Sequence, residues 1–182
     1  MPFSFGRQGA YNGIVERFPA VLDAPFWINA EHSGLTLHLL DYFHLVASQL
    51  VAEELTVLIE RISEPPAAAI LFAEWRAHGH VEILSPQSAF ERFDAGENEA
   101  IALAQEHGWV LLIDDAAPRH FSRGPLRLRI IDSAAFAVFL YDQARLDYSG
   151  AMNALLRSHA GRRMVGEARV ALELLARRKG ER

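Results

Sequence analysis

The chain has 182 residues, of which 51% are hydrophobic, no cysteine, and a formal net charge of −5. This length and composition predict one globular domain, and the lack of cysteine excludes a disulfide framework and a thiolate metal site. No stretch approaches the ~18 uninterrupted apolar residues of a membrane span, and the N-terminus lacks the pattern of a signal peptide. We therefore expect a soluble, cytoplasmic protein that does not contact a membrane.

Apolar runs and helical periodicities alternate through the first part of the chain. In chain order they predict a strand at 19–23, a helix at about 28–42, a strand at 43–47, a helix at 48–62 capped by Ser48, a helix at about 67–78, a strand at 80–84, a polar loop at 85–96 and a helix at 97–107. Pro65 and Pro66 separate the two consecutive helices, because proline is tolerated only in the first turn of a helix.

The same alternation continues to the C-terminus. It predicts a strand at 109–113, a short helix near 117–122, an edge strand at 126–131, and helices at 134–145, 148–158 and 165–179. The edge strand alternates apolar residues with arginine, and Ser133 is expected to cap the helix that follows it. Strands alternating with helices of this length predict an α/β fold, a three-layer α/β/α sandwich with a mostly parallel central sheet.

Acidic residues recur next to the apolar runs. Asp23 and the pair Asp114 and Asp115 lie at the carboxyl ends of predicted parallel strands, where open α/β sheets build their ligand sites. Glu54 and Glu97 lie on helices whose apolar stripes are expected to pack on the sheet. Carboxylates that converge in this way commonly hold divalent cations, which prefer oxygen ligands.

Helical geometry separates each of these glutamates from its neighbour, at ~100° per residue. Glu54 lies three residues after Val51 and borders the apolar stripe of its helix, whereas Glu53 points to the other side. Glu97 precedes the apolar residues of its own helix by three, four and seven positions, whereas Glu99 is expected to project away. Glu54 and Glu97 are therefore the candidates that face inward.

Each acid also has an ordinary structural explanation. Glu97 follows Asp94 by three residues and can belong to a capping box. Glu54 can border the core with its carboxylate in water, Asp114 and Asp115 can cap the next helix, and Asp23 can belong to a turn. The argument for a site therefore depends on the acids as a group.

Charge is distributed unevenly along the chain. Residues 1–115 hold 5 Lys and Arg against 17 Asp and Glu, whereas residues 116–182 hold 13 against 6. The basic second part is able to meet a phosphate backbone. The alternative is a solvated, cation-rich helical surface that ends in the RRKGER tail.

At these residues the chain resembles the PIN-domain family, metal-dependent ribonucleases that include the toxins of VapBC-type toxin–antitoxin pairs. It looks closest to a poorly characterised bacterial and archaeal branch. The motifs that carry the resemblance are VLDA at 21–24, INAEHSGLTLHLLDYF at 28–43, VAEEL at 51–55, GENEAIALA at 96–104, LLIDD at 111–115, and Arg119. The resemblance covers about residues 20–180, which implies a single PIN-like domain at 19–182 after an N-terminal extension at 1–18.

The resemblance implies an endoribonuclease that hydrolyses single-stranded RNA at an acidic site with Mg²⁺ or Mn²⁺. Carried across residue by residue, the catalytic, metal-binding acids are Asp23, Glu54, Glu97 and Asp114, with Glu99 and Asp115 as adjacent candidate ligands. RNA is expected to contact Arg119, Arg123, Arg127 and Arg129. The family also implies a homodimer and, for a type II toxin, an antitoxin protein as partner.

Two departures accompany the resemblance. Pro25 stands where the branch usually has a serine able to orient a carboxylate or a metal-bound water, which puts the metal affinity in question. The segment IIDSAAFAV replaces a glycine-containing turn, although Ser133 falls where the branch often has threonine or serine. The alternative function is therefore a PIN-like protein that has kept the fold, lost turnover and acts as a binding or regulatory partner.

Overall fold

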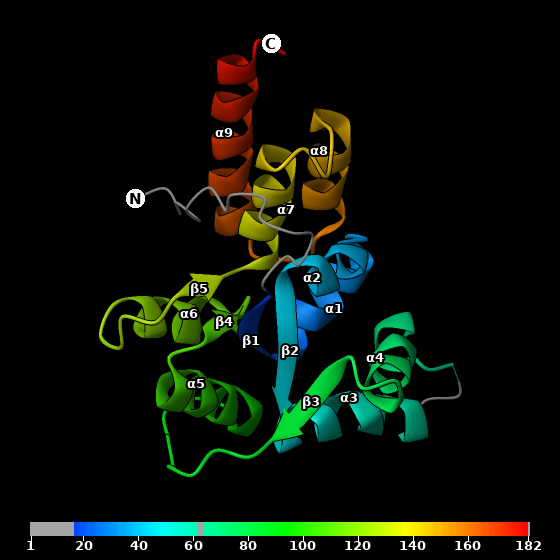
Figure 1. Ribbon diagram of the computed structural model, residues 1–182, viewed down its shortest axis with the longest axis vertical. Coiled ribbons are helices and arrows are strands. Elements are labelled where there is room, and N and C mark those ends of the chain that lie inside the picture. Colours follow the sequence, from blue (N-terminus) through cyan, green and yellow to red (C-terminus); the bar gives the residue numbers. More distant parts are fainter. Residues whose placement is uncertain (1–16, 62–63, 182) are drawn as a thin grey trace.

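The structure is a computed structural model that describes residues 17–61 and 64–181. Expectations for residues 1–16 and residue 62 lie outside the described residues. The elements in chain order are β1 (Phe18–Leu22), α1 (Ala24–His32), α2 (Thr36–Tyr42), β2 (Phe43–Ser48), α3 (Gln49–Arg61), α4 (Ala67–Ala77), β3 (Val81–Leu84), α5 (Ala95–His107), β4 (Val110–Leu112), α6 (Ala116–Arg123), β5 (Ile130–Ile131), α7 (Ser133–Asp142), α8 (Tyr148–Arg157) and α9 (Arg162–Lys179) (Figure 1).

The strands of the described residues form one parallel sheet in the order β3-β2-β1-β4-β5. β1 is central, and its Val21 pairs with Val46 of β2 and with Leu111 of β4. Because all strands run the same way, their carboxyl ends meet at one edge of the sheet. The predicted parallel sheet is confirmed, and β5 is the edge strand that the sequence indicates.

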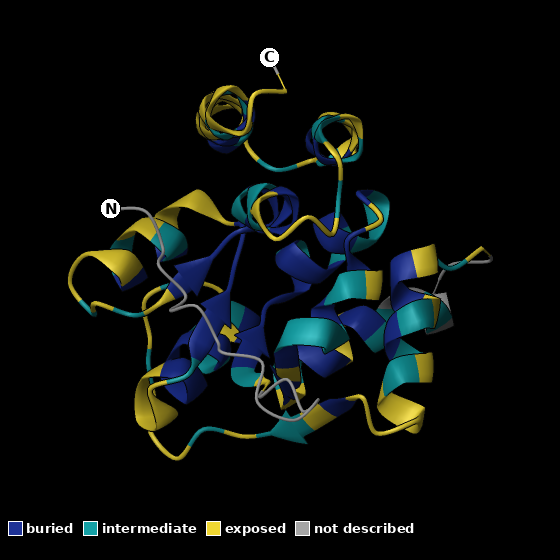
Figure 2. Cartoon of the chain, turned by 45° about the horizontal axis from the view of Figure 1, so that its top comes forward, coloured by how far each residue is buried: buried dark blue, intermediate teal, exposed yellow. Residues whose placement is uncertain are grey.

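Different helices cover the two faces of the sheet, because strand side chains point alternately to either side. On one face, Val21 and Leu111 pack with Ile101 and Leu103 of α5. On the other face, Leu22 and its neighbours pack with α1, α2, α3, α4 and α7. Figure 2 shows the buried residues concentrated on the strands and the exposed ones on the outer helices. The three-layer α/β/α sandwich is thus confirmed.

The three last helices pack against one another and stand together beyond the sheet (Figure 1). Their inner faces are largely alanine and leucine, and they continue the core that α1 and the sheet begin. In the described part of the chain, no helix combines the length and the apolar character needed to cross a membrane.

The predicted helix at 28–42 is wrong in its bounds and is two helices in the structure. Its first part begins earlier, at Ala24, because Asp23 caps it. It ends before Gly34, which has a φ of 72°, and the amide of Leu35 bonds back to the carbonyl oxygen of Ala30. A left-handed glycine of this kind ends a helix without the steric cost that other residues bear.

The predicted edge strand at 126–131 is shorter in the structure, where only Ile130 and Ile131 pair with β4. Arg127 has a positive φ of 55°, and the amide of Leu128 bonds to the carbonyl oxygen of Ser122 instead of to a strand. β4 itself has three residues, so there is little backbone for a longer β5 to pair with.

Candidate functional site

Asp23 lies at the carboxyl end of the central strand and is 1% exposed. Its Oδ1 accepts a hydrogen bond from the amide of Phe26 at 2.8 Å, which caps α1. Pro25 lies in the first turn of that helix and has no N–H to offer. The other oxygen, Oδ2, is buried without a hydrogen-bond partner. One atom of Asp23 thus builds the helix, and the second is left unsatisfied.

Burial raises the pKa of Asp23 well above its usual range. The hydrogen bond from Phe26 opposes this shift, whereas the charges of Asp114, Asp115 and Glu97 add to it. The structure therefore brings these four acids within electrostatic reach of one another, at the carboxyl edge of β1 and β4.

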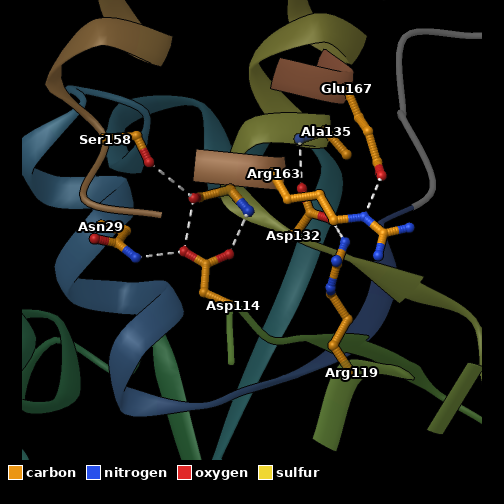
Figure 3. Close-up of polar contacts among 9 residues, drawn as sticks. Asn29, Asp114, Arg119, Asp132, Ala135, Ser158, Arg163 and Glu167 are labelled. Carbon is orange, nitrogen blue, oxygen red and sulfur yellow. Dashed lines mark hydrogen bonds and ion pairs between the residues drawn. The ribbon is translucent and has the colours of Figure 1, made fainter. Parts of the chain in front are cut away.

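Asp114 follows β4 and is 3% exposed. Its Oδ1 accepts a hydrogen bond from the amide of Ser133 at 2.7 Å, and its Oδ2 accepts from the Ser133 hydroxyl at 2.7 Å and from Nδ2 of Asn29 at 2.6 Å (Figure 3). Burial raises the pKa of Asp114, while these donors oppose the rise. Unlike Asp23, Asp114 has hydrogen bonds at both oxygens, and they fix its orientation.

The N-terminus of α7 supplies two of these donors. Its N-cap is Asp132, whose Oδ1 accepts from the amide of Ala135 at 2.8 Å. The expectation that Ser133 is the cap is therefore wrong by one residue, because Ser133 is the first helical residue and turns to Asp114. The second oxygen of Asp132, Oδ2, is 2.7 Å from Nη1 of Arg119 (Figure 3).

Glu97 and Asp115 form the other half of the acidic group. Glu97 belongs to a capping box with Asp94, whose amide donates to Oε2 of Glu97 at 3.3 Å, as the alternative interpretation holds. Burial, and then a hydrogen bond with Asp115, raise the pKa of Glu97 to about 7. A hydrogen bond between two carboxyl groups needs a proton, so Glu97 is able to donate to Asp115 when it is protonated.

Glu54 and Glu99 lie at the contact between α3 and α5. The amide of Gly96 bonds to the Glu54 carboxylate, and a Cβ on Gly96 would lie only 2.6 Å from Oε1 of Glu54. Oε2 of Glu99 accepts from the amide of Leu50 at 3.1 Å, so the expectation that Glu99 projects away is wrong. Each glutamate thus holds the N-terminus of the other helix.

Burial raises the pKa of Glu54, and the next largest contribution is the charge of Asp94. The acids that raise the pKa of Asp23 are different ones, namely Asp114, Asp115 and Glu97. Glu54 thus contacts the N-terminus of α5, the helix that also carries Glu97.

The four arginines with an expected role in RNA binding differ in their surroundings. Arg119 is paired with Asp132, and its side chain is 14% exposed. Arg123, Arg127 and Arg129 are exposed, and Nη2 of Arg129 donates to the carbonyl oxygen of Gly108 at 2.8 Å. Three of the four therefore present their charge to solvent.

The acids around Asp23 fit a divalent cation in their chemistry. Across residues 17–61 and 64–181, no three His, Cys, Asp or Glu side chains are already arranged as a set of metal ligands. The unsatisfied Oδ2 of Asp23 and the mutual repulsion of the acids are nevertheless both relieved by a bound cation with oxygen ligands. The residues able to hold it are Asp23, Glu97, Asp114 and Asp115.

Two residues that position Asp114 are not among the sequence-based candidates. Asn29 is separated from Asp114 by 85 residues, and no local pattern marks it. Asp132 lies in a segment that departs from the resembling branch, so the comparison of motifs gives it no role. A signal did exist for Ser133, because serine or threonine is frequent at its position in that branch.

Comparison with protein families identifies the family of this chain. A family model described as a PIN domain matches residues 21–132, from the central strand to the N-cap of α7. This segment is more than half of the chain and contains all of the acids described above. A comparison with curated proteins finds no match.

Proposed function

We propose that this chain, which belongs to the PIN-domain family, is a metal-dependent endoribonuclease that cleaves single-stranded RNA. PIN domains are nucleases in general, so hydrolysis of a nucleic acid is the coarse expectation from the family. RNA as substrate, Mg²⁺ or Mn²⁺ as cofactor and the residues that bind them are the finer parts of the proposal.

One observation supports this proposal above the others, the unsatisfied and buried Oδ2 of Asp23 among Glu97, Asp114 and Asp115. A buried carboxylate oxygen without a partner is costly, and structural acids usually have their hydrogen bonds satisfied. A site that is stable only when a cation or a proton is present is what a metal-dependent enzyme requires.

The residues around the site would have distinct tasks. A bound divalent cation would lower the pKa of a water molecule and offset the charge on a scissile phosphate. Asn29 and Ser133 hold the Asp114 carboxylate in one orientation. Glu97 is partly protonated near neutral pH, because its pKa is raised to about 7, and a bound cation would displace that proton. Glu54 would act indirectly, through its bond to the first turn of α5.

The substrate would be bound by exposed cations. Arg123 is the last residue of α6, and Arg127 and Arg129 lie in the exposed segment that leads to β5. Single-stranded RNA suits such a site, because its bases are free to splay out and its phosphates remain accessible. The attraction between these arginines and the RNA phosphates would be electrostatic and therefore sensitive to salt.

A partner is part of the proposal only for the toxin role. As the toxin of a type II pair the chain would bind an antitoxin protein, and we expect a homodimer as in the family. Light scattering tests the dimer. A short reading frame beside the gene, whose product co-purifies with the chain, would support the toxin role.

The alternative is a PIN-like protein that binds without turnover. Both oxygens of Asp114 already accept hydrogen bonds, which favours a carboxylate with a structural task. Pro25, in place of the serine of the resembling branch, points the same way.

Incubation of the purified protein with labelled single-stranded RNA separates these functions. We expect cleavage with Mn²⁺ or Mg²⁺, none with EDTA, and none from Asp23→Asn, whereas Glu53→Gln on the exposed side of α3 serves as the matched control and cleaves normally. Cleavage that survives EDTA contradicts the metal-dependent mechanism. Tight RNA binding without cleavage in either metal supports the alternative.

A further inference from the structure

We infer that Arg119 is a positioning residue that acts on Asp114 through Asp132 and the first turn of α7, and that it is not a contact for RNA. This inference rests on the proposed function, since it assigns Asp114 to the metal site. It goes beyond that function because it identifies an ion pair, outside the acidic group, that sets the orientation of one of the acids.

The ion pair between Arg119 and Asp132 is shielded from water. Nη1 of Arg119 lies 2.7 Å from Oδ2 of Asp132, and the two side chains are 14% and 7% exposed. Charge-assisted hydrogen bonds of this length are directional, and they are strong where water does not compete. Removal of either partner would leave the other charge buried and uncompensated.

Asp132 passes this constraint to α7, because its two oxygens have different tasks. Oδ2 binds Arg119, while Oδ1 accepts from the amide of Ala135 and caps the helix. The guanidinium therefore fixes the rotamer of the cap, and with it the direction of the first turn. Ser133, the next residue, presents its amide and hydroxyl to the two oxygens of Asp114, each at 2.7 Å.

The contacts close a ring that joins two strand ends. Asp114 follows β4 and is separated from Arg119 by less than two turns of α6. Arg119 reaches Asp132 after β5, and Ser133 returns to Asp114. β5 pairs with β4 through only two residues, so its own ladder is a weak support for this end of the sheet. The ion pair supplies the missing constraint.

The charge of Arg119 is also poorly available to a phosphate. It is paired with Asp132, and a second carboxylate, Glu167, is close enough that Arg119, like Arg123, contributes to lowering its pKa, after the larger effect of Arg163 (Figure 3). Arg123, one helical turn further along α6, is exposed. This pair of arginines on one helix therefore offers a matched comparison between a positioning and a binding role.

The test measures metal and RNA binding separately. The full-length protein is titrated with Mn²⁺ alone in a calorimeter, and RNA affinity is measured by fluorescence anisotropy in EDTA. We expect Arg119→Met and Asp132→Asn each to weaken Mn²⁺ binding roughly tenfold, the lower end for residues that orient metal ligands. RNA affinity in EDTA should stay unchanged. Arg123→Met should show the opposite, weaker RNA binding and unchanged Mn²⁺ affinity.

The double variant tests whether the two residues act along one path. If Arg119 works through Asp132, then Arg119→Met with Asp132→Asn weakens Mn²⁺ binding no more than either substitution alone. If the two substitutions together weaken Mn²⁺ binding by the product of their separate effects, the inference is overturned. A loss of RNA affinity in Arg119→Met with Mn²⁺ affinity intact would also overturn it. Should Arg119→Met fail to fold, Asp132→Asn carries the test, because asparagine retains an oxygen for the helix cap.

A readout without metal distinguishes failure of this inference from failure of the proposed function. The Ser133 amide donates to Asp114 in the protein as it stands, so we expect its hydrogen exchange to be protected in NMR spectra of the metal-free protein. That protection should be lost in Asp132→Asn and in Arg119→Met. If the parent protein binds no Mn²⁺ but this protection is lost, the function fails and the positioning stands. Retained protection in both variants overturns the positioning.

Discussion

The carboxyl groups of Glu97 and Asp115 are close enough for a hydrogen bond that raises the pKa of Glu97, although one lies in the first turn of α5 and the other shortly after β4. Such a bond exists only while one of the two is protonated. The acidic group of this protein is therefore a proton-binding site as well as a candidate cation site, and a cation and a proton compete for it.

The stability of the metal-free protein should fall as the pH rises from about 5 to 8. The pKa of Glu97 is raised to about 7 in the folded protein, so the folded state binds this proton more tightly than the unfolded chain does. The resulting stabilisation is complete below the usual glutamate pKa and is lost as the pH rises through about 7. Denaturant unfolding across this range, in EDTA, measures it.

Glu97→Gln provides the control, because glutamine does not titrate. Its unfolding free energy should depend less on pH over the same range. With saturating Mn²⁺ the slope for the parent protein should decrease or reverse, since a cation replaces the proton. A parent protein whose stability is flat between pH 5 and 8 in EDTA would contradict the shared proton.

Asp23→Asn should raise the melting temperature of the metal-free protein. Asparagine keeps an acceptor for the Phe26 amide and removes a buried charge whose pKa is raised by burial and by three acidic neighbours. A gain of about 1 kcal/mol corresponds to roughly 2–4 °C for a chain of this size. The stabilisation added by Mn²⁺, which follows RT ln(1 + [L]/Kd), should shrink in the same variant.

Asp114→Asn should lower the melting temperature of the metal-free protein. Three hydrogen-bond donors point at the Asp114 carboxylate, and an amide nitrogen in place of one oxygen meets a donor instead of an acceptor. We expect a loss of about 1–3 kcal/mol, the range for an unsatisfied buried group. Equal melting temperatures for Asp23→Asn and Asp114→Asn would mean that the hydrogen bonds at Asp114 contribute little.

Gly96→Ala tests the contact between α3 and α5. The added Cβ would lie 2.6 Å from Oε1 of Glu54, so the carboxylate has to move and loses its bond to α5. We expect destabilisation of about 1 kcal/mol, comparable to the loss of a helix cap. In a Glu54→Ala background the same change should stabilise the protein by about 0.5–1 kcal/mol through helix propensity. Thermal or denaturant unfolding of the parent protein, the two single variants and the double variant completes this double-mutant cycle.

RNA binding should depend on salt through the exposed arginines. Replacing Arg123, Arg127 and Arg129 by methionine, one at a time, should each reduce the slope of log affinity against log salt by ~0.7, the value for one phosphate of a single strand. Anisotropy titrations in EDTA between low and moderate salt give the slopes. Arg169, which pairs with Glu173 on α9, is a matched control whose substitution should leave the slope unchanged.

Local patterns account for much of this protein. Short apolar runs and helical periodicities predict the parallel sheet and its helices, because a strand buried on both faces is a continuous apolar run and a helix with one apolar stripe has a recognisable spacing. The same patterns put Asp23 and Asp114 at strand ends, and parallel strands end at one edge of the sheet. The break at Gly34 is not predicted, since a glycine inside a periodic segment is compatible with either continuing or ending a helix.

The sequence by itself determined which acids lie at the ends of the strands, because that depends only on where each apolar run stops. Only the tertiary structure decided what each carboxylate binds. Glu54 contacts the N-terminus of α5, and Glu99 contacts the N-terminus of α3. Asn29 donates a hydrogen bond to Asp114, which is 85 residues away in the sequence. Such choices depend on which donors the packed helices bring within about 3 Å, and hydrogen bonds weaken steeply beyond that distance and with poor alignment. A periodicity assigns a side chain to a face, and the packing of the helices selects its partner.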